Sequence, residues 1–596
     1  MPGITGIIGP SIPNGAATSQ IDAMVRCLAH EPDFVTGSLR NDDLALQLGW
    51  ASRPGSAAGC ALAWNGRRDT CLLFFGDDFG PGANTAESLI LLYEKRGPGF
   101  LLELNGCFSG LLVDLRQQKV ILFNDRYGLS RIYLHESPDG FFFSSEAKSL
   151  LAVLPQLRQI DQRGLAEFFS VGCVLQNRSL FQGISLLPGG AMWTFHRDGR
   201  IDQGRYFDPK TWEQQEILGA TAYSERLREV FGRITPHYLK GPRRVGMSLT
   251  GGLDGRMIMA WAKAAPGSLP CYTFGGRYRD CADVRIARKL AKICGQPHTT
   301  IPMGNDFFTD FPALAEKTVW LTDGAMDVSG AVELYVNRLA REIAPVRLTG
   351  NYGSEILRSN VAFRPGSLDT ALFTPEFCRL LGEAAETYRS EAAGHRLSFI
   401  AFKQIPWHHY ARLAVEKSQL APRTPFLDNE LVALAYQAPL ESAGSTAPLL
   451  QLITEGNPAL GSVGTDRALR RRPLPILTRL ATAWQEFTAK AEYAYDYGMP
   501  GWLAQADHAV ARLHVERLFL GRHKFYHFRV WYRDQLGGYL RASLDSGDSP
   551  SCYRDGSVGK IVRGHLSGRS NRTLELHKLL SVQLIEKLLL RSPCPD

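Results

Sequence analysis

The N-terminal third of the chain carries short apolar runs separated by polar turn residues. Short runs of this kind, punctuated by glycine, proline and aspartate, are typical of β-strands joined as hairpins. The expected elements are a strand at residues 119–123, a turn at 125–128, a hairpin of 131–135 and 141–145 across Pro138-Asp139-Gly140, and a short helix at 146–153. This part of the chain is therefore expected to be rich in β-hairpins and to close near Tyr206-Phe207.

After a linker-like stretch at residues 208–219, strands begin to alternate with helices. Apolar runs of strand length end in glycine, and segments of helical period follow them. The expected elements are a helix at 220–238, a strand that ends at Gly251-Gly252, an apolar helix at 257–264, a strand at 271–276, a helix at 283–294, a strand opened by His298 and a glycine-rich strand end at 346–355. This alternation predicts a parallel sheet, and the last part of the chain is mostly helical in pattern.

Length and composition change this picture little. The 596 residues suggest two to four domains, and 44% hydrophobic with 21% charged residues is typical of a soluble globular protein. No run of about 18 apolar residues occurs, so we expect no membrane insertion. The N-terminus lacks the basic and then apolar pattern of a signal peptide, so we expect a cytoplasmic protein.

Charge and cysteine content also exclude some classes of function. The net charge of +8 is mild for this size, and Arg470-Arg471-Arg472 fits a solvated face or a contact to phosphates, so we expect no nucleic-acid partner. None of the eleven cysteines forms a Cys-x-x-Cys pair. They are expected to be reduced thiols rather than a disulfide framework or a zinc site.

The stretch from Val245 to Arg256 carries the first chemical signal. A buried strand is expected to lead through Gly251-Gly252 into a helix, which places backbone N–H groups and the positive helix end around an anion. Asp254 stands where a carboxylate could hold a magnesium ion beside that anion. The stretch is not a Walker loop, because no Gly-Lys-Ser/Thr follows the turn. An ordinary glycine-rich turn between strand and helix is the alternative interpretation.

Several motifs resemble a known family. Thr250-Gly251-Gly252-Leu253-Asp254 is similar to the pyrophosphate loop of the ATP-pyrophosphatase enzymes. Residues 124–128, 143–148 and Leu187-Pro188-Gly189-Gly190 resemble the glutaminase domain of glutamine-dependent asparagine synthetases. Arg423-Thr424-Pro425-Phe426-Leu427-Asp428 resembles the family's Arg-x-Pro-Phe-Leu-Asp, so Arg423 is expected to order the loop near the substrate and Asp428 to cap the next helix. The likeness runs from residue 1 to about 440.

The resemblance implies an α/β protein in three parts. Residues 1–207 would form a glutaminase-like αββα sandwich of the N-terminal-nucleophile type. Residues 220–475 would form a parallel-sheet ATP-pyrophosphatase domain of the asparagine synthetase kind. Residues 476–596 lie beyond the standard family and are expected to form a helical extension packed on the synthetase domain.

The glutaminase machinery of the family does not carry over. The family begins Met-Cys-Gly and uses that cysteine as its nucleophile, whereas Pro2 offers neither a thiol nor a primary amine. The family's Asn-Gly-Glu matches Phe75-Gly76-Asp77, which lacks the amide donor of the oxyanion hole. The family's Ser-Asp-x-Glu best matches Thr85-Ala86-Glu87, without the aspartate that grips glutamine. We therefore expect no glutamine hydrolysis.

The resemblance also implies a nucleotide site. ATP is expected as the nucleotide and Mg²⁺ as the metal, with Asp254 as the metal ligand. The residues expected to bind ATP are Leu249, Thr250, Gly251, Gly252, Leu253, Asp254, Gly255, Phe274, Thr349 and Gly350.

Two positions of the family's synthetase site are altered. In the family's Ser-Gly-Glu-Gly-x-Asp-Glu, the first acid is Asn351 here and the magnesium-binding aspartate is Ser354. An amide cannot accept a proton from an incoming amine, so Glu355 is the predicted catalytic base, with a structural acid at a helix start as the alternative. The family's lysine that steadies the adenylate is missing from residues 463–467, so Arg467 is predicted to be the catalytic cation.

The function implied is an ATP-dependent amide-forming ligase. A small-molecule or peptide carboxylate would be activated as an acyl-adenylate with release of pyrophosphate, and asparagine from aspartate is the default family reaction. The partner would be ammonia, an amine on a second substrate, or an amine in the same molecule, as in the β-lactam synthetase and lasso-peptide cyclase branches. A non-catalytic nucleotide- or partner-binding protein is the alternative, and a homodimer stays open.

Overall fold

A computed structural model describes residues 3–9, 14–53, 61–80, 85–366, 368–442, 444–465, 483–484, 487–518, 520–544 and 550–591. The N-terminal part contains two six-stranded antiparallel sheets. The first has the strand order β10 (Ser185–Leu186), β8 (Tyr133–Ser137), β9 (Gly140–Ser144), β1 (Gly3–Ile8), β3 (Leu46–Ser52), β2 (Val35–Asn41). The second has the order β12 (Ile201–Arg205), β11 (Ala191–His196), β7 (Lys119–Asn124), β6 (Gly106–Asp114), β5 (Thr70–Asp78), β4 (Ala61–Trp64).

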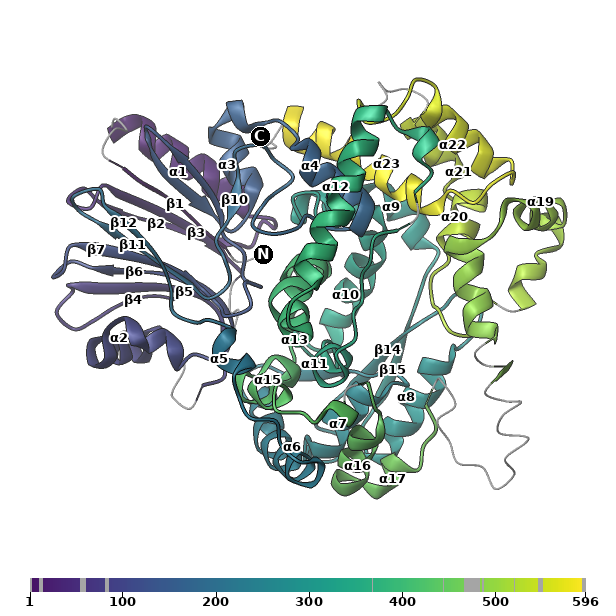
Figure 1. The fold of residues 1–596 in the computed structure, drawn as a ribbon, viewed down its shortest axis with the longest axis horizontal. Coiled ribbons are helices and arrows are strands. Elements are labelled where there is room, and N and C mark those ends of the chain that lie inside the picture. Colours follow the sequence, from purple (N-terminus) through teal and green to yellow (C-terminus); the bar gives the residue numbers. More distant parts are fainter. Residues whose placement is uncertain are drawn as a thin grey trace.

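These two sheets pack face to face between two helical layers (Figure 1). Alternate side chains such as Leu48, Leu111 and Phe143 fill the space between the sheets. Helix α1 (Asn14–Leu28) covers the first sheet together with α3 (Ala147–Val153), and α2 (Ala86–Arg96) covers the second. The layers therefore run helix, sheet, sheet, helix, and the predicted αββα sandwich is confirmed.

The local predictions for this part also agree with the structure. Strands β8 and β9 pair across the expected turn, with Ser137 opposite Gly140. Helix α3 begins directly after Glu146. A further helix, α4 (Gln162–Val171), starts at the cap Asp161, whose carboxylate accepts the Gly164 N–H.

The central part is a five-stranded, wholly parallel sheet. Its order is β15 (His298–Pro302), β14 (Cys271–Gly275), β13 (Val245–Ser248), β16 (Val346–Thr349), β17 (Ala421–Arg423). The surrounding helices are α5 (Lys210–Glu213), α6 (Ala220–Ile234), α7 (Leu253–Trp261), α8 (Ala282–Ile293), α9 (Asp306–Leu321), α10 (Ala331–Ile343), α11 (Gly353–Arg358), α12 (Pro375–Ala392), α13 (Arg396–Phe399), α14 (Tyr410–Gln419), α15 (Asn429–Ala435), α16 (Ala447–Gly456) and α17 (Pro458–Gly461). The parallel α/β prediction is confirmed, and Asp428 caps α15 by accepting the Glu430 N–H at 3.0 Å.

The C-terminal part is helical, as its pattern predicts. Its described helices are α19 (Gly501–Ala509), α20 (Phe528–Asp534), α21 (Gly537–Leu544), α22 (Ser557–Leu566) and α23 (Thr573–Ile585). The hydrophobic cluster that holds Phe528 and Trp531 also contains Phe142 of the sandwich and Phe307 of α9. The division at residues 207 and 475 stays a prediction, since one core joins all three parts.

A buried ionic contact also joins the sandwich to the central part. Lys148, on α3, places its ammonium 3.3 Å from the Asp323 carboxylate and 2.9 Å from the Trp320 carbonyl. The same carboxylate accepts the N–H groups of Ala147 at 2.7 Å and Lys148 at 3.2 Å. Lys148 and Asp323 are 0% and 3% exposed, so this contact lies in the protein interior.

Two expectations about the whole chain can be compared with the described residues. Every cysteine among them is a free thiol, as expected. None of the described helices has the length and apolar character needed to cross a membrane.

Candidate active site

A pocket of about 290 Å³, which we call the strand-edge pocket, lies at the carboxyl ends of strands β13 and β16. This edge is the usual ligand position in an open parallel sheet. The lining residues come from strands β13 and β16, from the turns and helix starts that follow them, and from α14 with the residue before it: Ser248, Thr250, Gly252, Asp254, Gly255, Arg347, Thr349, Gly350, Asn351, Tyr352, Ser354, Glu355, His409, Arg412, Leu413 and Glu416. The sequence-predicted residues that meet here are Thr250, Gly252, Asp254, Gly255, Thr349, Gly350 and Glu355.

The turn after β13 presents the start of α7 to this pocket. Within the described residues no side chain caps α7 at Gly252, and Gly252, Asp254 and Gly255 at this helix start line the pocket. The Gly251 N–H instead donates to the Asp283 carboxylate at 2.8 Å. A carboxylate on this N–H shows that the turn can hold an anion, in agreement with the positive end of the helix dipole.

Buried side chains fix the path of this turn. Leu249 and Leu253, 0% and 6% exposed, anchor its two ends in the core rather than lining the pocket. Arg256 is fully buried and donates to the carbonyls of Gly251 at 3.0 Å and Gly464 at 3.1 Å. Its role was not predicted from the sequence, although an arginine inside an otherwise apolar helix was a signal.

Asp254 is the acidic residue of the pocket that is best suited to a metal. Its Oδ2 accepts the Ser354 N–H at 3.1 Å and the Ser354 hydroxyl at 2.7 Å. Its Oδ1 is buried and has no hydrogen-bond partner among the described residues. Burial raises the pKa of this carboxyl, and the Ser354 hydrogen bonds oppose the rise. A carboxylate oxygen without a partner among the described residues, beside an uncapped helix start, fits Mg²⁺.

The turn after β16 touches the turn after β13. A Cβ on Gly350 would lie 2.6 Å from the Gly255 nitrogen, so only glycine fits between the two backbones. Glu355 lies next to Ser354 and lines the pocket. Burial raises the pKa of Glu355, and the negative charge of Asp254 raises it further. The two predicted acidic residues therefore share one pocket and influence each other's charge.

Tyr352 has a strained backbone at the boundary of this pocket. Its φ of +73° lies in the left-handed region, which is uncommon for a bulky residue and costs about 1–3 kcal/mol. The side chain is 5% exposed, and its ring lies 5.5 Å from the His409 ring, centroid to centroid. The family pattern has glycine at this position, which was the available signal.

A buried ionic network forms the wall opposite the two glycine turns. Arg347, from the middle of β16, contacts Glu416 of α14 at 3.2 Å and donates to the Ser248 hydroxyl at 3.0 Å. Nearby, Arg412 lies 3.3 Å from Glu333. Arg347 and Glu416 are 6% and 1% exposed, so each requires the other's charge. Sequence reasoning missed this network, although an arginine inside a four-residue buried strand signalled it.

The remaining predicted residues lie elsewhere. Phe274 does not line this pocket among the described residues; its ring packs between the Arg347 guanidinium and the Phe525 ring of the C-terminal part, at 5.4 and 5.7 Å. Arg467 lies outside the described residues. Arg423 faces a different cavity, where it donates to the Lys240 carbonyl at 2.7 Å and lies 3.4 Å from Asp77.

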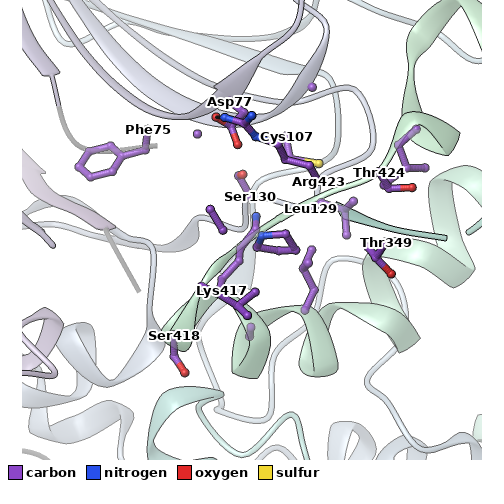
Figure 2. A pocket seen from close by; sticks show the side chains of 18 of the residues that line it. Phe75, Asp77, Cys107, Leu129, Ser130, Thr349, Lys417, Ser418, Arg423 and Thr424 are labelled. Atoms are coloured by element: carbon purple, nitrogen blue, oxygen red, sulfur yellow. Dashed lines mark hydrogen bonds and ion pairs between the residues drawn. The ribbon is translucent and has the colours of Figure 1, made fainter. Parts of the chain in front are cut away.

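That second cavity, of about 190 Å³, lies between the sandwich and the parallel-sheet part, and we call it the interdomain cavity. Figure 2 shows Asp77 and Cys107 on the side of the sandwich strands and Lys417 and Ser418 on the opposite side, on α14. Phe75, at the family's oxyanion position, lines the cavity. Burial raises the pKa of the Cys107 thiol to about 12, so this cysteine stays protonated at neutral pH and offers no thiolate nucleophile.

The interdomain cavity and the strand-edge pocket share part of their walls. The residues that line both are Thr349, Asn351, Tyr352 and Leu413. The strained Tyr352 therefore stands where the two spaces meet.

Two adjacent histidines beside the strand-edge pocket make stability depend on pH. Burial, with a smaller contribution from Arg412, lowers the pKa of His408 to about 4; burial, with His408 and Arg412, lowers that of His409 to about 3. A histidine with a lowered folded pKa stabilises the fold fully above pH 6.5, and this contribution is lost as the pH falls from 6.5 toward the folded value.

We therefore expect His409→Gln to reduce the loss of unfolding free energy between pH 7 and pH 5. Each histidine of this kind contributes about 1.4 kcal/mol per pH unit below 6.5. Urea denaturation at the two pH values measures the difference. His508→Gln, at an exposed site, is the matched control. An equal pH dependence in the parent and His409→Gln would contradict this account.

Comparison with known proteins agrees with this arrangement of parts. A family model described as a glutamine amidotransferase domain matches residues 79–207. A second, described as asparagine synthase, matches residues 226–445. The first match begins after Pro2 and Phe75, and the second contains the turns that form the strand-edge pocket.

Curated relatives match about half of the chain or less. Putative asparagine synthetase [glutamine-hydrolyzing] 2 of Methanocaldococcus jannaschii is 24% identical over 309 residues, which cover 50% of this chain and 58% of that protein. Asparagine synthetase [glutamine-hydrolyzing] 1 of Bacillus subtilis is 24% identical over 300 residues, 49% of this chain and 46% of the relative. Asparagine synthetase [glutamine-hydrolyzing] of Homo sapiens is 28% identical over 225 residues, which cover 36% of this chain and 38% of that protein. The chain thus spans about half the length of the curated relatives it matches.

A solved structure of glutamine phosphoribosylpyrophosphate amidotransferase from B. subtilis, complexed with ADP and GMP, also matches. It is 10% identical and the match covers 51% of this chain and 67% of that one. The TM-score of 0.24 is too low to indicate a shared overall fold.

Proposed function

This chain belongs to the asparagine synthetase family, and we propose that it is an ATP-dependent ligase that forms an amide. A substrate carboxylate is activated as an acyl-adenylate with release of pyrophosphate, and ammonia or an amine then takes the acyl group. The observation that carries this proposal is the buried Asp254 oxygen without a partner beside an uncapped helix start. Such a place suits a metal-bound pyrophosphate.

The strand-edge pocket supplies a role for each group in the first step. The turn from Thr250 to Gly255 holds the phosphates through its N–H groups and the start of α7. Mg²⁺, held by Asp254, would neutralise negative charge on the departing pyrophosphate. Arg412 lines the same pocket with an exposed side chain and provides positive charge for the substrate carboxylate.

The second step needs a proton acceptor and a cation. We assign the proton to the Glu355 carboxylate, because it lines the pocket and its pKa is raised by burial and by Asp254. Arg467 is proposed as the cation that steadies the reacting group, and its position lies outside the described residues. Arg467→Ala should then slow amide formation more than pyrophosphate exchange.

A non-catalytic nucleotide-binding protein is the second candidate. The observation that favours it is the replacement of the family's two acidic residues by Asn351 and Ser354. Ser354 offers no carboxylate for a metal and instead donates two hydrogen bonds to one oxygen of Asp254. Release of pyrophosphate from ATP in the presence of a panel of carboxylic acids separates the two candidates. Release that depends on one of the acids supports the ligase, and its absence with every acid supports the binding protein.

Glutamine is not the expected source of ammonia. We expect glutamate release from glutamine to stay at background, because Pro2 replaces the nucleophile and Phe75 replaces the oxyanion amide. Restoring the nucleophile alone, in Pro2→Cys, should not produce activity, since Phe75 still stands where the family has the oxyanion amide. An enzyme-coupled glutamate assay measures both proteins. Glutamate release above background by protein free of contaminating amidase would refute this expectation.

A further inference from the structure

The interdomain cavity has a strongly unequal charge. Its described lining contains one carboxylate, that of Asp77. The cationic side chains in the same lining are Arg53, Arg131, Arg243, Arg341, Lys417 and Arg423. Cations that share a partly buried space repel one another and lose hydration, so the arrangement is unfavourable unless an anion enters.

Three of these cations are held by the protein itself. Arg53 donates to the carbonyls of Ser418 at 2.8 Å and Gln419 at 3.0 Å. Arg131 donates to the Pro406 carbonyl at 2.7 Å. Arg423 is held by the Lys240 carbonyl and Asp77, as described above. These side chains form part of the wall of the cavity, and each already has acceptors within the protein.

The other three cations remain available to a ligand. Within the described part of the chain, Arg243 and Lys417 make no hydrogen bond or ion pair with a protein acceptor, although both line the cavity. Among the described residues, Arg341 has one ion-pair partner, Glu342 at 3.7 Å. Lys417 is half-buried on α14, on the side facing Cys107 (Figure 2).

The electrostatic effects indicate that the arginines lie near one another. Burial lowers the pKa of Arg53, the positive charge of Arg341 and, to a smaller extent, that of Arg243 lower it further, and the carboxylates of Asp33 and Glu31 oppose the shift. Burial also lowers the pKa of Arg243, with Asp77 opposing and Arg423 adding to the effect. Arg53, Arg243, Arg341 and Arg423 are thus close enough to influence one another, and all four line the interdomain cavity.

The rest of the lining suggests how a ligand would be oriented. Apolar groups, including Phe34, Leu129 and Leu413, line the cavity alongside the cations. Leu413 and Tyr352 also line the strand-edge pocket. A molecule with its anionic end on Arg243, Arg341 and Lys417 could thus extend along apolar surface toward Tyr352 and the acyl-adenylate.

We propose that the interdomain cavity binds the amine substrate of the ligase, and that this substrate is a primary amine carrying a carboxylate or phosphate group. The inference rests on the proposed function. The amine nitrogen would attack the acyl-adenylate carbonyl carbon and form the amide C–N bond. The C–O bond to the phosphate breaks, AMP leaves with its electron pair, and the nitrogen loses its proton to Glu355.

Isothermal titration calorimetry on the full chain tests the cavity directly. The probes are γ-aminobutyrate for the carboxylate, phosphoethanolamine for the phosphate, and butylamine as an amine without an anion. We expect saturable binding of at least one anionic amine below about 10 mM and none of butylamine. Arg243→Ala and Arg341→Ala should each weaken that binding at least about tenfold. Arg244→Ala, at the exposed neighbouring position, is the matched control and should bind like the parent.

The results show whether the anionic group is a carboxylate or a phosphate, or they contradict the inference. Binding of γ-aminobutyrate alone identifies a carboxylate, and binding of phosphoethanolamine alone identifies a phosphate. The inference is overturned if the parent binds neither probe, binds butylamine equally well, or loses no affinity in the two arginine variants.

A separate assay distinguishes failure of this inference from failure of the proposed function. Hydroxylamine replaces the amine, and the parent is tested for ATP-dependent hydroxamate formation with a panel of carboxylic acids. A parent that forms hydroxamate yet binds no anionic amine overturns the inference alone. A parent that binds the anionic amine yet forms no hydroxamate with any acid counts against the ligase, while the cavity remains an anion site.

Discussion

Asp254→Asn should lower the rate of ATP-dependent pyrophosphate release by at least about 10²-fold without lowering the stability of the fold. Asparagine can still accept the hydrogen bonds from Ser354, but it lacks the negative charge that would hold Mg²⁺. Burial raises the pKa of Asp254, which means that its ionised form costs folding free energy. Removing the charge should therefore leave the unfolding free energy equal to that of the parent or higher.

Pyrophosphate release and urea denaturation, measured on the same preparations, test both halves of this expectation. Asp280→Asn is the control, because this exposed aspartate pairs with Arg288 on the surface. It should retain the activity of the parent. An active Asp254→Asn variant would place the metal elsewhere, and an unfolded one would show that this carboxylate is structural.

The second large effect is expected at Glu355. Glu355→Gln should slow amide formation by about 10²–10⁴-fold, the usual cost of removing a general base, and should change pyrophosphate exchange by less than about tenfold. Adenylation needs no proton acceptor, so only the later step depends on this carboxylate. The burial and the Asp254 charge that raise its pKa should also place the acid limb of the pH–rate profile above the usual glutamate range.

Glu416→Gln is the informative comparison, since Glu416 is the other carboxylate of the pocket that was not predicted. Its loss leaves Arg347 buried without its ion-pair partner, which typically costs about 3–5 kcal/mol of stability. Glu355→Gln should instead remain as stable as the parent. A folded Glu416→Gln protein with the larger loss of amide formation would reassign the base to Glu416.

The sequence predicts well those features that depend on neighbouring residues. The hairpin of β8 and β9, the cap at Asp428 and the strand, turn and helix around Gly251-Gly252 follow from turn residues, capping residues and period, and the structure contains each of them. The turns after β13 and β16 meet because parallel strands place their carboxyl ends at one edge.

Features that depend on distant residues could not be predicted. Arg347 and Glu416 come together only after β16 and α14 have packed, and neither sequence position specifies its partner. The contact of the Phe274 ring with Phe525 of the C-terminal part also joins residues that are far apart in the sequence. The charge of the interdomain cavity likewise arises from cations on separate elements.

The buried contact between Lys148 and Asp323 gives the sandwich a role that does not depend on catalysis. If the sandwich were deleted, the Asp323 carboxylate would lose the ammonium and both backbone N–H groups that now compensate its charge. The hydrophobic cluster that contains both Phe142 and Phe307 would lose its sandwich members, and apolar surface would be exposed in the same event. When the glutaminase-like site of such a protein decays, the residues around that site can therefore still be conserved. Selection for a folded ligase preserves them because they support the rest of the fold.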